Sequence, residues 1–243
     1  MTNLSFLETI NFEINDECSL TNVHKGCPRN ADRWKKLGRE RPVSDEEFVN
    51  FVKYCIDAEF GRRISPWYYN EPLSTPDRLT TLVDALPECK FNLWTNGTLL
   101  KGNEGVLRRM DWIMVTRYKE TDTKTLASLM EDSRYNIVSK RGILDGRINE
   151  DVEPHFNHRR NHCPKSRSSD IHIDYYGNLH ICCMDWRGEI EIGNIQDDSP
   201  EVLISKWNEV RFLDHSWNEK TFSDIPHVCQ LCTMWLPSWH SLR

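Results

Sequence analysis

The chain of 243 residues is long enough for one α/β domain, or for such a domain with a small appendage. Its net charge of -6 argues against a dedicated nucleic-acid-binding protein, whose surface would be basic overall. No apolar run approaches the roughly 20 residues of a membrane-spanning helix, and no secretory signal is visible. We therefore expect a cytoplasmic protein that binds neither nucleic acid nor membrane.

The nine cysteines are many for a protein that keeps its thiols reduced. Without an export signal, metal binding or redox chemistry is favoured over a disulfide framework. The odd number also fits poorly with complete pairing. The place of each cysteine in the predicted elements therefore bears on its role.

The first part of the sequence alternates between predicted strands and helices. An extended segment at 10–15 precedes a helix at 44–60, which begins with a capping box formed by Ser44 and Glu47. Further elements follow in chain order: strand 62–69, helix 75–86, strands 90–95 and 111–118, helix 122–132 and strand 134–139. This alternation predicts parallel βα units, and there is room for about five or six of them before residue 150. The expected fold is an α/β partial (β/α)6-type barrel.

Two cysteines in this part have a structural interpretation. Cys55 lies on the apolar face of the helix at 44–60, and Cys89 follows the helix at 75–86 with no cysteine or histidine nearby. The second helix is predicted to begin with Thr75 as its N-cap and Pro76 at its first position. Cys55 is expected to be a core thiol, and Cys89 is expected to be structural.

Near residue 150 the composition of the sequence becomes polar, and the regular alternation of predicted strands and helices ends. The run "IHIDYYGNLHICC" at 171–183 then predicts a β-hairpin, and Ser199 and Pro200 begin a predicted helix at 199–212. We therefore predict a barrel domain at 1–150 and a small hairpin and helix domain at 151–243.

Four cysteines of the second domain can form one tetrahedral site. The pattern C-x13-G-x4-C contains Cys163 and Cys182, and a later C-x2-C contains Cys229 and Cys232. Four thiolates suit zinc or one iron–sulfur cluster, and the spacing does not separate the two. Cys183 is predicted to lie on the same strand as Cys182, so its side chain is expected on the opposite face and outside the site.

Several motifs together resemble one enzyme superfamily. The cysteine pattern, with "IGNIQDDSPEVLISKWNEVRF" between its halves, resembles the SPASM/twitch extension of radical S-adenosylmethionine (SAM) enzymes. In "YYNEP", Asn70, Glu71 and Pro72 stand in place of the Gly-Glu-Pro of the family's Gly-Gly-Glu-Pro segment, and "LWTNGTLL" is similar to another family segment. Because the C-terminal cysteines provide ligands for one cluster, this part of the chain resembles the shorter twitch form. The overall size is similar to the aminocyclitol dehydrogenases of antibiotic biosynthesis.

The resemblance implies a SAM site at the carboxyl ends of the barrel strands. Asn70, Glu71 and Pro72 would bind the amino group of SAM, and the turn after Thr95 and Asn96 would let the backbone approach a ligand closely. From their chemistry, Thr116 and Arg117 could hold a ribose hydroxyl and a carboxylate. The four C-terminal cysteines would hold an auxiliary [4Fe–4S] cluster.

The loop "ECSLTNVHKGCPRN" at 17–30 departs from the family's C-x3-C-x2-C pattern. Aligned on its last cysteine, it has the form C-x5-H-x2-C, with Cys18, His24 and Cys27 as candidate ligands. Imidazole can ligate iron in clusters but raises their reduction potential, which opposes electron transfer to SAM. A loop histidine in a lost site and a zinc site are alternatives, and we predict that His24 replaces the middle thiolate.

The resemblance implies an enzyme that uses a [4Fe–4S] cluster to cleave SAM reductively to a 5′-deoxyadenosyl radical, with an electron donor such as flavodoxin or ferredoxin. The radical would abstract hydrogen from a peptide or a small metabolite, and family frequency slightly favours a peptide. The auxiliary cluster would bind substrate or accept an electron. The alternative is a catalytically degenerate binding or partner protein that keeps only a structural iron–sulfur or zinc site in its C-terminal domain.

Overall fold

The computed structural model describes residues 3–20, 41–129, 131–132, 134–139, 169–183, 185 and 188–212. Five predicted metal ligands, His24, Cys27, Cys163, Cys229 and Cys232, lie outside these residues. Cys18 and Cys182 lie within them. In this described part, no helix combines the length and apolar character that crossing a membrane requires.

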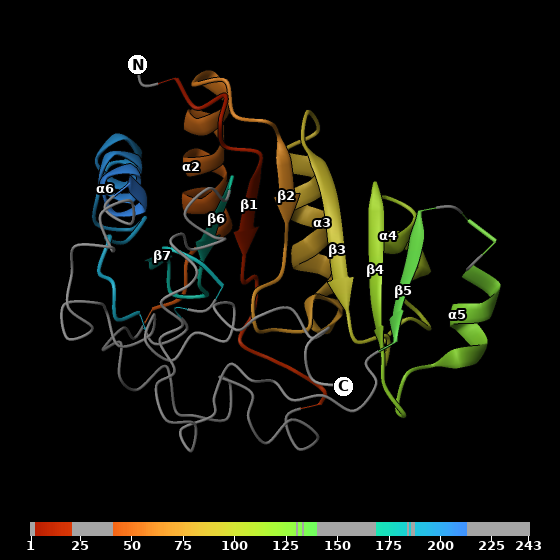
Figure 1. The fold of residues 1–243 in the computed structure, drawn as a ribbon. Coiled ribbons are helices and arrows are strands. Elements are labelled where there is room, and N and C mark those ends of the chain that lie inside the picture. Colours follow the sequence, from red (N-terminus) through yellow and green to blue (C-terminus); the bar gives the residue numbers. More distant parts are fainter. Residues whose placement is uncertain are drawn as a thin grey trace, which may run out of the picture.

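The described residues form a layer of strands covered by helices (Figure 1). The strands are β1 (Thr9–Phe12), β2 (Arg63–Ser65), β3 (Lys90–Thr95), β4 (Trp112–Arg117), β5 (Tyr135–Ser139), β6 (Asp170–Ile173) and β7 (Leu179–His180). The helices are α2 (Asp45–Asp57), α3 (Pro76–Ala85), α4 (Glu104–Leu107), α5 (Thr123–Leu129) and α6 (Pro200–Phe212), with a 3-10 turn η2 (Pro72–Ser74).

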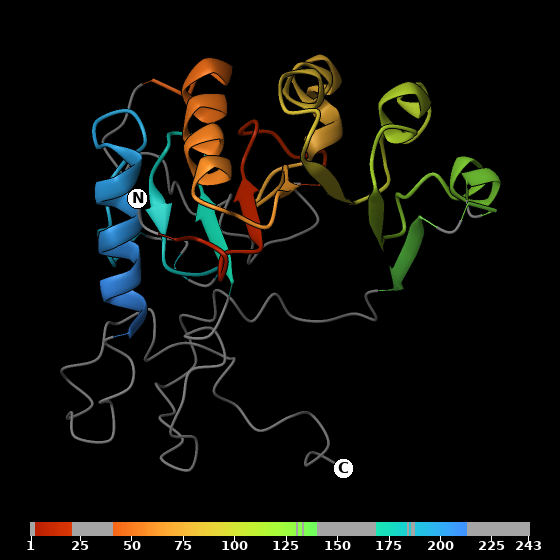
Figure 2. The same ribbon diagram turned by 90° about the horizontal axis from the view of Figure 1, so that it is seen from above.

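The strands belong to one seven-stranded sheet with the order β5-β4-β3-β2-β1-β6-β7. All neighbours are parallel except β6 and β7, which are antiparallel. In Figure 2 the strands follow an arc, and the helices lie along its outer side. The predicted α/β class built of parallel βα units is confirmed.

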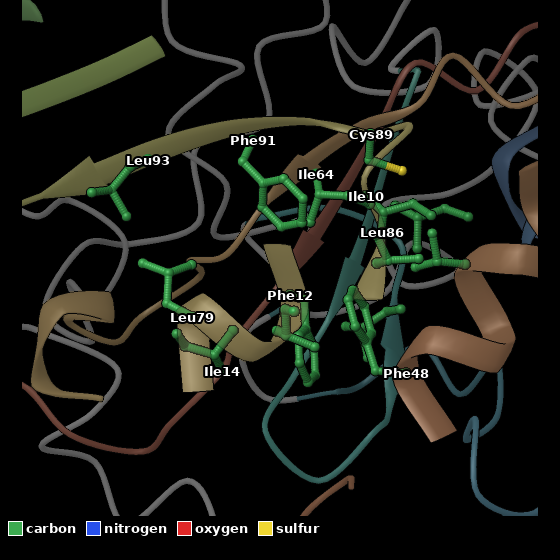
Figure 3. Close-up of a cluster of buried hydrophobic side chains, with 14 of the residues drawn as sticks. Ile10, Phe12, Ile14, Phe48, Ile64, Leu79, Leu86, Cys89, Phe91 and Leu93 are labelled. Carbon is green, nitrogen blue, oxygen red and sulfur yellow. The ribbon is translucent and has the colours of Figure 1, made fainter. Parts of the chain in front are cut away.

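The core lies between the sheet and the helices. Along β1 and its extension, Ile10, Phe12 and Ile14 are fully buried, and the Phe12 ring stacks on Phe48 of α2 with centroids 3.8 Å apart (Figure 3). The alternate residues of this stretch are polar and also buried, and they include Asn11 and Glu13. Because side chains alternate across a strand, β1 presents an apolar face to the helices and a polar face to the inside of the arc.

Local signals placed helix α2 and two cysteines correctly. The capping box of Ser44 and Glu47 is present, and Cys55 is completely buried on the helix face that meets the sheet. Cys89 also joins the core. Burial raises the pKa of Cys89 to about 12 and that of Cys55 further still, so neither thiol is suited to bind a metal as thiolate.

The start of α3 differs from the prediction in its side-chain contacts. Thr75 does occupy the N-cap position, but its side chain makes no capping hydrogen bond. Its hydroxyl oxygen instead accepts a hydrogen bond of 2.8 Å from Nδ2 of Asn15. A contact across 60 residues of chain therefore replaces the local cap.

Strand β2 is shorter than predicted, and helix α4 was not predicted. Pro66 has no N–H to continue a ladder, and Trp67 N turns back to the carbonyl of Ser65 at 2.8 Å. The chain therefore leaves the sheet after three residues of β2 and becomes a loop that contains Tyr68 and Tyr69.

The hairpin of the C-terminal part extends the sheet of the N-terminal part. Strand β6 pairs in parallel with β1, with Ile171 opposite Ile10. Strand β7 ends at His180, so Cys182 and Cys183 lie in a bend and turn rather than on a strand, and the expectation that strand alternation separates their side chains is wrong. The domain boundary predicted near residue 150 falls outside the described residues and stays a prediction.

Candidate functional site

The predicted motifs converge at one edge of the sheet. Segments 13–20, 66–71, 96–98 and 118–121 follow β1, β2, β3 and β4, and these strands are parallel. Their carboxyl ends therefore point the same way, as Figure 1 shows. This edge is where α/β folds place their ligands.

Glu71 joins two of these segments through its carboxylate. Only 1% of the residue is exposed. Oε1 accepts hydrogen bonds from Thr95 Oγ1 at 2.7 Å and Leu73 N at 3.2 Å, and Oε2 accepts one from Asn96 N at 2.8 Å. Burial raises the pKa of Glu71, and these hydrogen bonds partly oppose the rise. The carboxylate therefore holds the loop after β2 to the end of β3.

The loop that begins at Glu17 is bonded directly to the same segment. Glu71 N donates to the carbonyl of Glu17 at 2.7 Å, and Nδ2 of Asn15 donates to the carbonyl of Glu71 at 3.0 Å. The next residue, Cys18, is partly exposed, and its Sγ accepts a hydrogen bond from Leu20 N at 3.5 Å. The first candidate cluster ligand therefore lies one residue from a contact with the Asn70-Glu71-Pro72 segment.

The turn after β3 requires its glycine for packing. Gly97 has φ +73°, and a Cβ there would lie 2.7 Å from Cγ2 of Thr121 and 2.8 Å from Cγ1 of Val115. Nδ2 of Asn96 donates to Ser19 Oγ at 3.1 Å, which brings this turn to the loop that carries Cys18. The close backbone approach predicted here is made to the chain's own side chains.

Thr116 and Arg117 lie at the end of β4, farther along the same edge. Thr116 is buried, and its hydroxyl oxygen accepts a hydrogen bond of 2.5 Å from Nε1 of Trp94. The Trp94 ring packs against Trp67 with centroids 4.7 Å apart. Arg117 is exposed. The structure thus engages the Thr116 hydroxyl within the protein and leaves Arg117 at the surface.

Asn70 contains a buried donor without a partner. Tyr68 N donates to its Oδ1 at 3.0 Å, which fixes the orientation of the amide, because Nδ2 in that place would face another donor. Nδ2 is buried and has no hydrogen-bond partner within the described ranges. A buried donor left unpaired costs about 1–3 kcal/mol, so a ligand acceptor would be favoured there.

The segment that carries Cys182 is held by a buried pair that was not predicted. His180 Nε2 lies 2.9 Å from Oδ2 of Asp174, and both side chains are fully buried. His180 Nδ1 lies 2.7 Å from the main-chain oxygen of Asp185, which can only accept, so Nδ1 carries a proton. The short spacing Asp-x5-His was visible, but the contact depends on the turn at residues 175–178.

A full metal site cannot be assembled from the described residues, where no group of three or more Cys, His, Asp or Glu side chains forms a cluster. Five of the seven predicted ligands lie outside this part of the chain. Of the two described ligands, Cys18 lies at the edge formed by the carboxyl ends of the strands, and Cys182 follows the hairpin of β6 and β7. The ligand sets remain predictions.

Comparison with known proteins bears on both parts of the chain. Residues 163–233 match the SPASM family, described as an iron–sulfur cluster-binding domain, and all four C-terminal candidate cysteines fall in this range. The fold is similar to a crystal structure of BtrN in complex with AdoMet and 2-DOIA, with TM-score 0.64, 15% identity, and coverage of 91% of this chain and 92% of that chain.

A second structure, of selenomethionine BtrN in an open conformation, gives TM-score 0.63 and 17% identity over 93% of this chain and 92% of that chain. No curated protein sequence matches the chain. The fold similarity extends over both predicted domains, and the family match supplies the iron–sulfur interpretation of the C-terminal cysteines.

Proposed function

We propose that this chain is an enzyme that cleaves SAM reductively and abstracts hydrogen from a substrate, because its fold is similar to that of BtrN, which was crystallised with AdoMet, and its residues 163–233 match the SPASM iron–sulfur cluster-binding domain. The observation that carries the proposal is the hydrogen bond from Glu71 N to the carbonyl of Glu17. It places Cys18 beside the Asn70-Glu71-Pro72 segment. A cluster ligand and a SAM-binding segment must be neighbours for this chemistry.

The SAM site is supported by the state of Asn70. Its unpaired Nδ2 is a donor suited to the carboxylate of SAM, and the main-chain carbonyls of the segment suit the cationic amino group. Glu71 fixes the segment against Thr95 and Asn96 while keeping its own carboxylate out of contact with water. In this proposal Asn70 binds SAM, and Glu71 holds the segment in place.

The barrel cluster is supported by Cys18, and in this proposal His24 and Cys27 complete its ligands. The Cys18 thiol is partly exposed and accepts a hydrogen bond from Leu20 N, which suits a thiolate, whereas Cys55 and Cys89 are buried thiols with raised pKa. When bound, a [4Fe–4S] cluster supplies the electron that cleaves SAM to methionine and a 5′-deoxyadenosyl radical.

The auxiliary cluster is proposed on Cys163, Cys182, Cys229 and Cys232. All four lie in the matched SPASM range, and Cys182 is partly exposed in a turn whose main chain is fixed by hydrogen bonds. Cys183 packs against Tyr68 and Tyr69, which supports leaving it out of the ligand set. In this proposal, packing against the two tyrosines, rather than alternation along a strand, separates Cys183 from the ligands.

The substrate in this proposal is a peptide or a small metabolite, processed in the cytoplasm with electrons from a flavodoxin or ferredoxin. The fold similarity to BtrN, whose complex contains 2-DOIA, supports testing small molecules first. The auxiliary cluster would bind substrate or accept an electron from it. A degenerate protein with a structural metal site is the outcome that the following measurements would identify.

Metal content and SAM cleavage test the proposal. After anaerobic reconstitution, we expect about eight irons and as many sulfides per chain, an EPR signal of the reduced protein that changes on addition of SAM, and release of 5′-deoxyadenosine. About four irons and no 5′-deoxyadenosine would indicate the degenerate alternative. Zinc without iron would end the radical SAM proposal.

Two pairs of variants assign the ligands. Cys182→Ser should reduce the iron content from about eight to about four per chain, and Cys183→Ser should leave it unchanged. His24→Ala should lose the barrel cluster, and His24→Cys should retain it. Equal iron in the two cysteine variants would contradict the auxiliary ligand set. Unchanged iron and SAM cleavage in His24→Ala would remove His24 from the barrel site.

A further inference from the structure

Two adjacent tyrosines connect Asn70-Glu71-Pro72, the segment proposed to bind SAM and called the SAM segment below, to the turn that carries Cys182. Tyr68 and Tyr69 lie directly before Asn70, and 1% and 7% of these residues are exposed. The Tyr68 hydroxyl donates to the carbonyl of Cys182 at 3.2 Å, and the Tyr69 hydroxyl donates to the carbonyl of Cys183. Two consecutive hydroxyls therefore hold two consecutive carbonyls that lie 114 residues away.

The tyrosines are themselves anchored on the barrel side. Tyr69 N donates to Oε1 of Glu13 at 3.2 Å, and Oε2 of the same carboxylate accepts a hydrogen bond from Tyr175 N at 3.3 Å. Glu13 directly follows β1 and is fully buried. One carboxylate therefore joins the loop after β2 to the turn of the hairpin. This contact fixes the loop that carries the two tyrosine hydroxyls.

The turn at Cys182 is held from its other side as well. The carbonyl of Cys182 also accepts a hydrogen bond of 3.1 Å from Asp185 N, and the carbonyl of Asp185 meets Nδ1 of His180. The Tyr68 ring packs against the His180 ring with centroids 5.5 Å apart. Both lone pairs of the Cys182 carbonyl are thus engaged, one within its own turn and one by the loop of the SAM segment.

We infer that Tyr68 and Tyr69 are positioning residues for the auxiliary cluster, because their hydroxyls fix the main chain of Cys182 and Cys183 on the loop that carries Asn70. The properties of an iron–sulfur cluster depend on the hydrogen bonds and the solvent around its ligands, and both change if this turn moves. The inference rests on the proposed function, since it requires an iron–sulfur cluster on Cys182.

The test uses a chain in which Cys18→Ala and Cys27→Ala remove the barrel cluster. This parent should keep about four irons, and the reduced auxiliary cluster should be the source of its EPR signal. Tyr68→Phe and Tyr69→Phe each remove one oxygen atom and keep the ring. We expect each to shift the EPR g values and the midpoint potential, and to release iron to a chelator roughly fivefold faster, as for the loss of one hydrogen bond.

Tyr54→Phe in the same parent is the matched control. Tyr54 lies on α2, and its hydroxyl is buried with no hydrogen-bond partner in the part of the chain that the structure describes. This variant should keep the parent's spectrum, potential and iron release. The inference is overturned if Tyr68→Phe and Tyr69→Phe behave like Tyr54→Phe. A parent without iron would instead contradict the proposed auxiliary cluster itself, which separates the two failures.

Discussion

Two buried carboxylates, Glu71 and Asp174, organise the two regions of the molecule in different ways. Glu71 is 1% exposed and accepts from neutral donors, namely a threonine hydroxyl and two main-chain N–H groups. Asp174 is 0% exposed and faces the imidazole of His180 in addition to amide donors of Tyr176 and Asn178. The two carboxylates therefore differ in their partners: Asp174 faces a histidine, and Glu71 accepts hydrogen bonds from uncharged donors. Each carboxylate with its partners is called a centre below.

The two centres also differ in the distance between their partners along the chain. Two partners of Glu71 are the last residue of β3 and the residue after it, 24 and 25 residues away, whereas His180 and Asn178 lie within six residues of Asp174. The first centre forms only when β2 and β3 are paired, and the second can form within the hairpin. Glu71 is therefore fixed by contacts between strands, whereas Asp174 is fixed mainly by residues of its own hairpin.

The comparison predicts that the Asp174 centre is the more sensitive to mutation. Asp174→Ala leaves His180 buried without its carboxylate and leaves the amide donors of Asn178 without an acceptor, so it should lower the free energy of unfolding by about 3–5 kcal/mol. Chemical denaturation measures the loss. Asp57→Ala, which removes an exposed carboxylate at the end of α2, should stay within about 0.5 kcal/mol. A loss below about 1 kcal/mol in Asp174→Ala would contradict the view that this pair organises the hairpin.

Asn70 tests the other region through ligand affinity. Asn70→Ala removes the unpaired Nδ2, and a hydrogen bond from it to the SAM carboxylate would be worth about 1.5–3 kcal/mol. We expect SAM to bind roughly tenfold more weakly or worse, as measured by equilibrium binding to the reconstituted protein. Asn136→Ala on β5, where the side chain is exposed, should bind SAM like the unchanged protein. Equal affinities in the two variants would show that Nδ2 meets no ligand.

Much of the fold was accessible from local patterns in the sequence. The capping box at Ser44 and the apolar face that includes Cys55 depend on residues within one or two helical turns, and both were correct. The order of the predicted strands and helices was also correct, although α4 was missed, and it placed the SAM segment and the turn after β3 at one edge of the sheet. These signals survive because tertiary packing reinforces them.

The contacts that organise the site were not accessible in the same way. The hydroxyl of Thr75 pairs with Asn15 rather than with its own helix, and Tyr68 reaches a carbonyl 114 residues away. The carboxylate of Glu71 was expected to face a ligand, but burial and three internal donors turn it into the protein. Each outcome is decided by which strands become neighbours, and a single sequence does not contain that information in its local spacing.

Glu71→Gln has the smallest expected effect and tests the charge of the Glu71 carboxyl group in the folded protein. Both oxygens of a carboxyl group can accept a hydrogen bond, protonated or not, whereas the amide nitrogen of glutamine only donates. Either Asn96 N or the pair of Thr95 and Leu73 therefore loses an acceptor, at a cost of about 1 kcal/mol near pH 5. Burial raises the pKa of Glu71 above its ordinary value of 4.5. The folded protein therefore binds this proton more tightly than the unfolded chain. The stabilising contribution of Glu71 is complete below about pH 4.5 and is lost as the pH rises through the folded pKa.

The difference in unfolding free energy between the unchanged protein and Glu71→Gln should accordingly narrow from about pH 5 towards neutrality in a series of urea titrations. A difference that widens with pH would mean that the hydrogen bonds outweigh burial and lower the pKa, and the two carboxylate centres would then be alike.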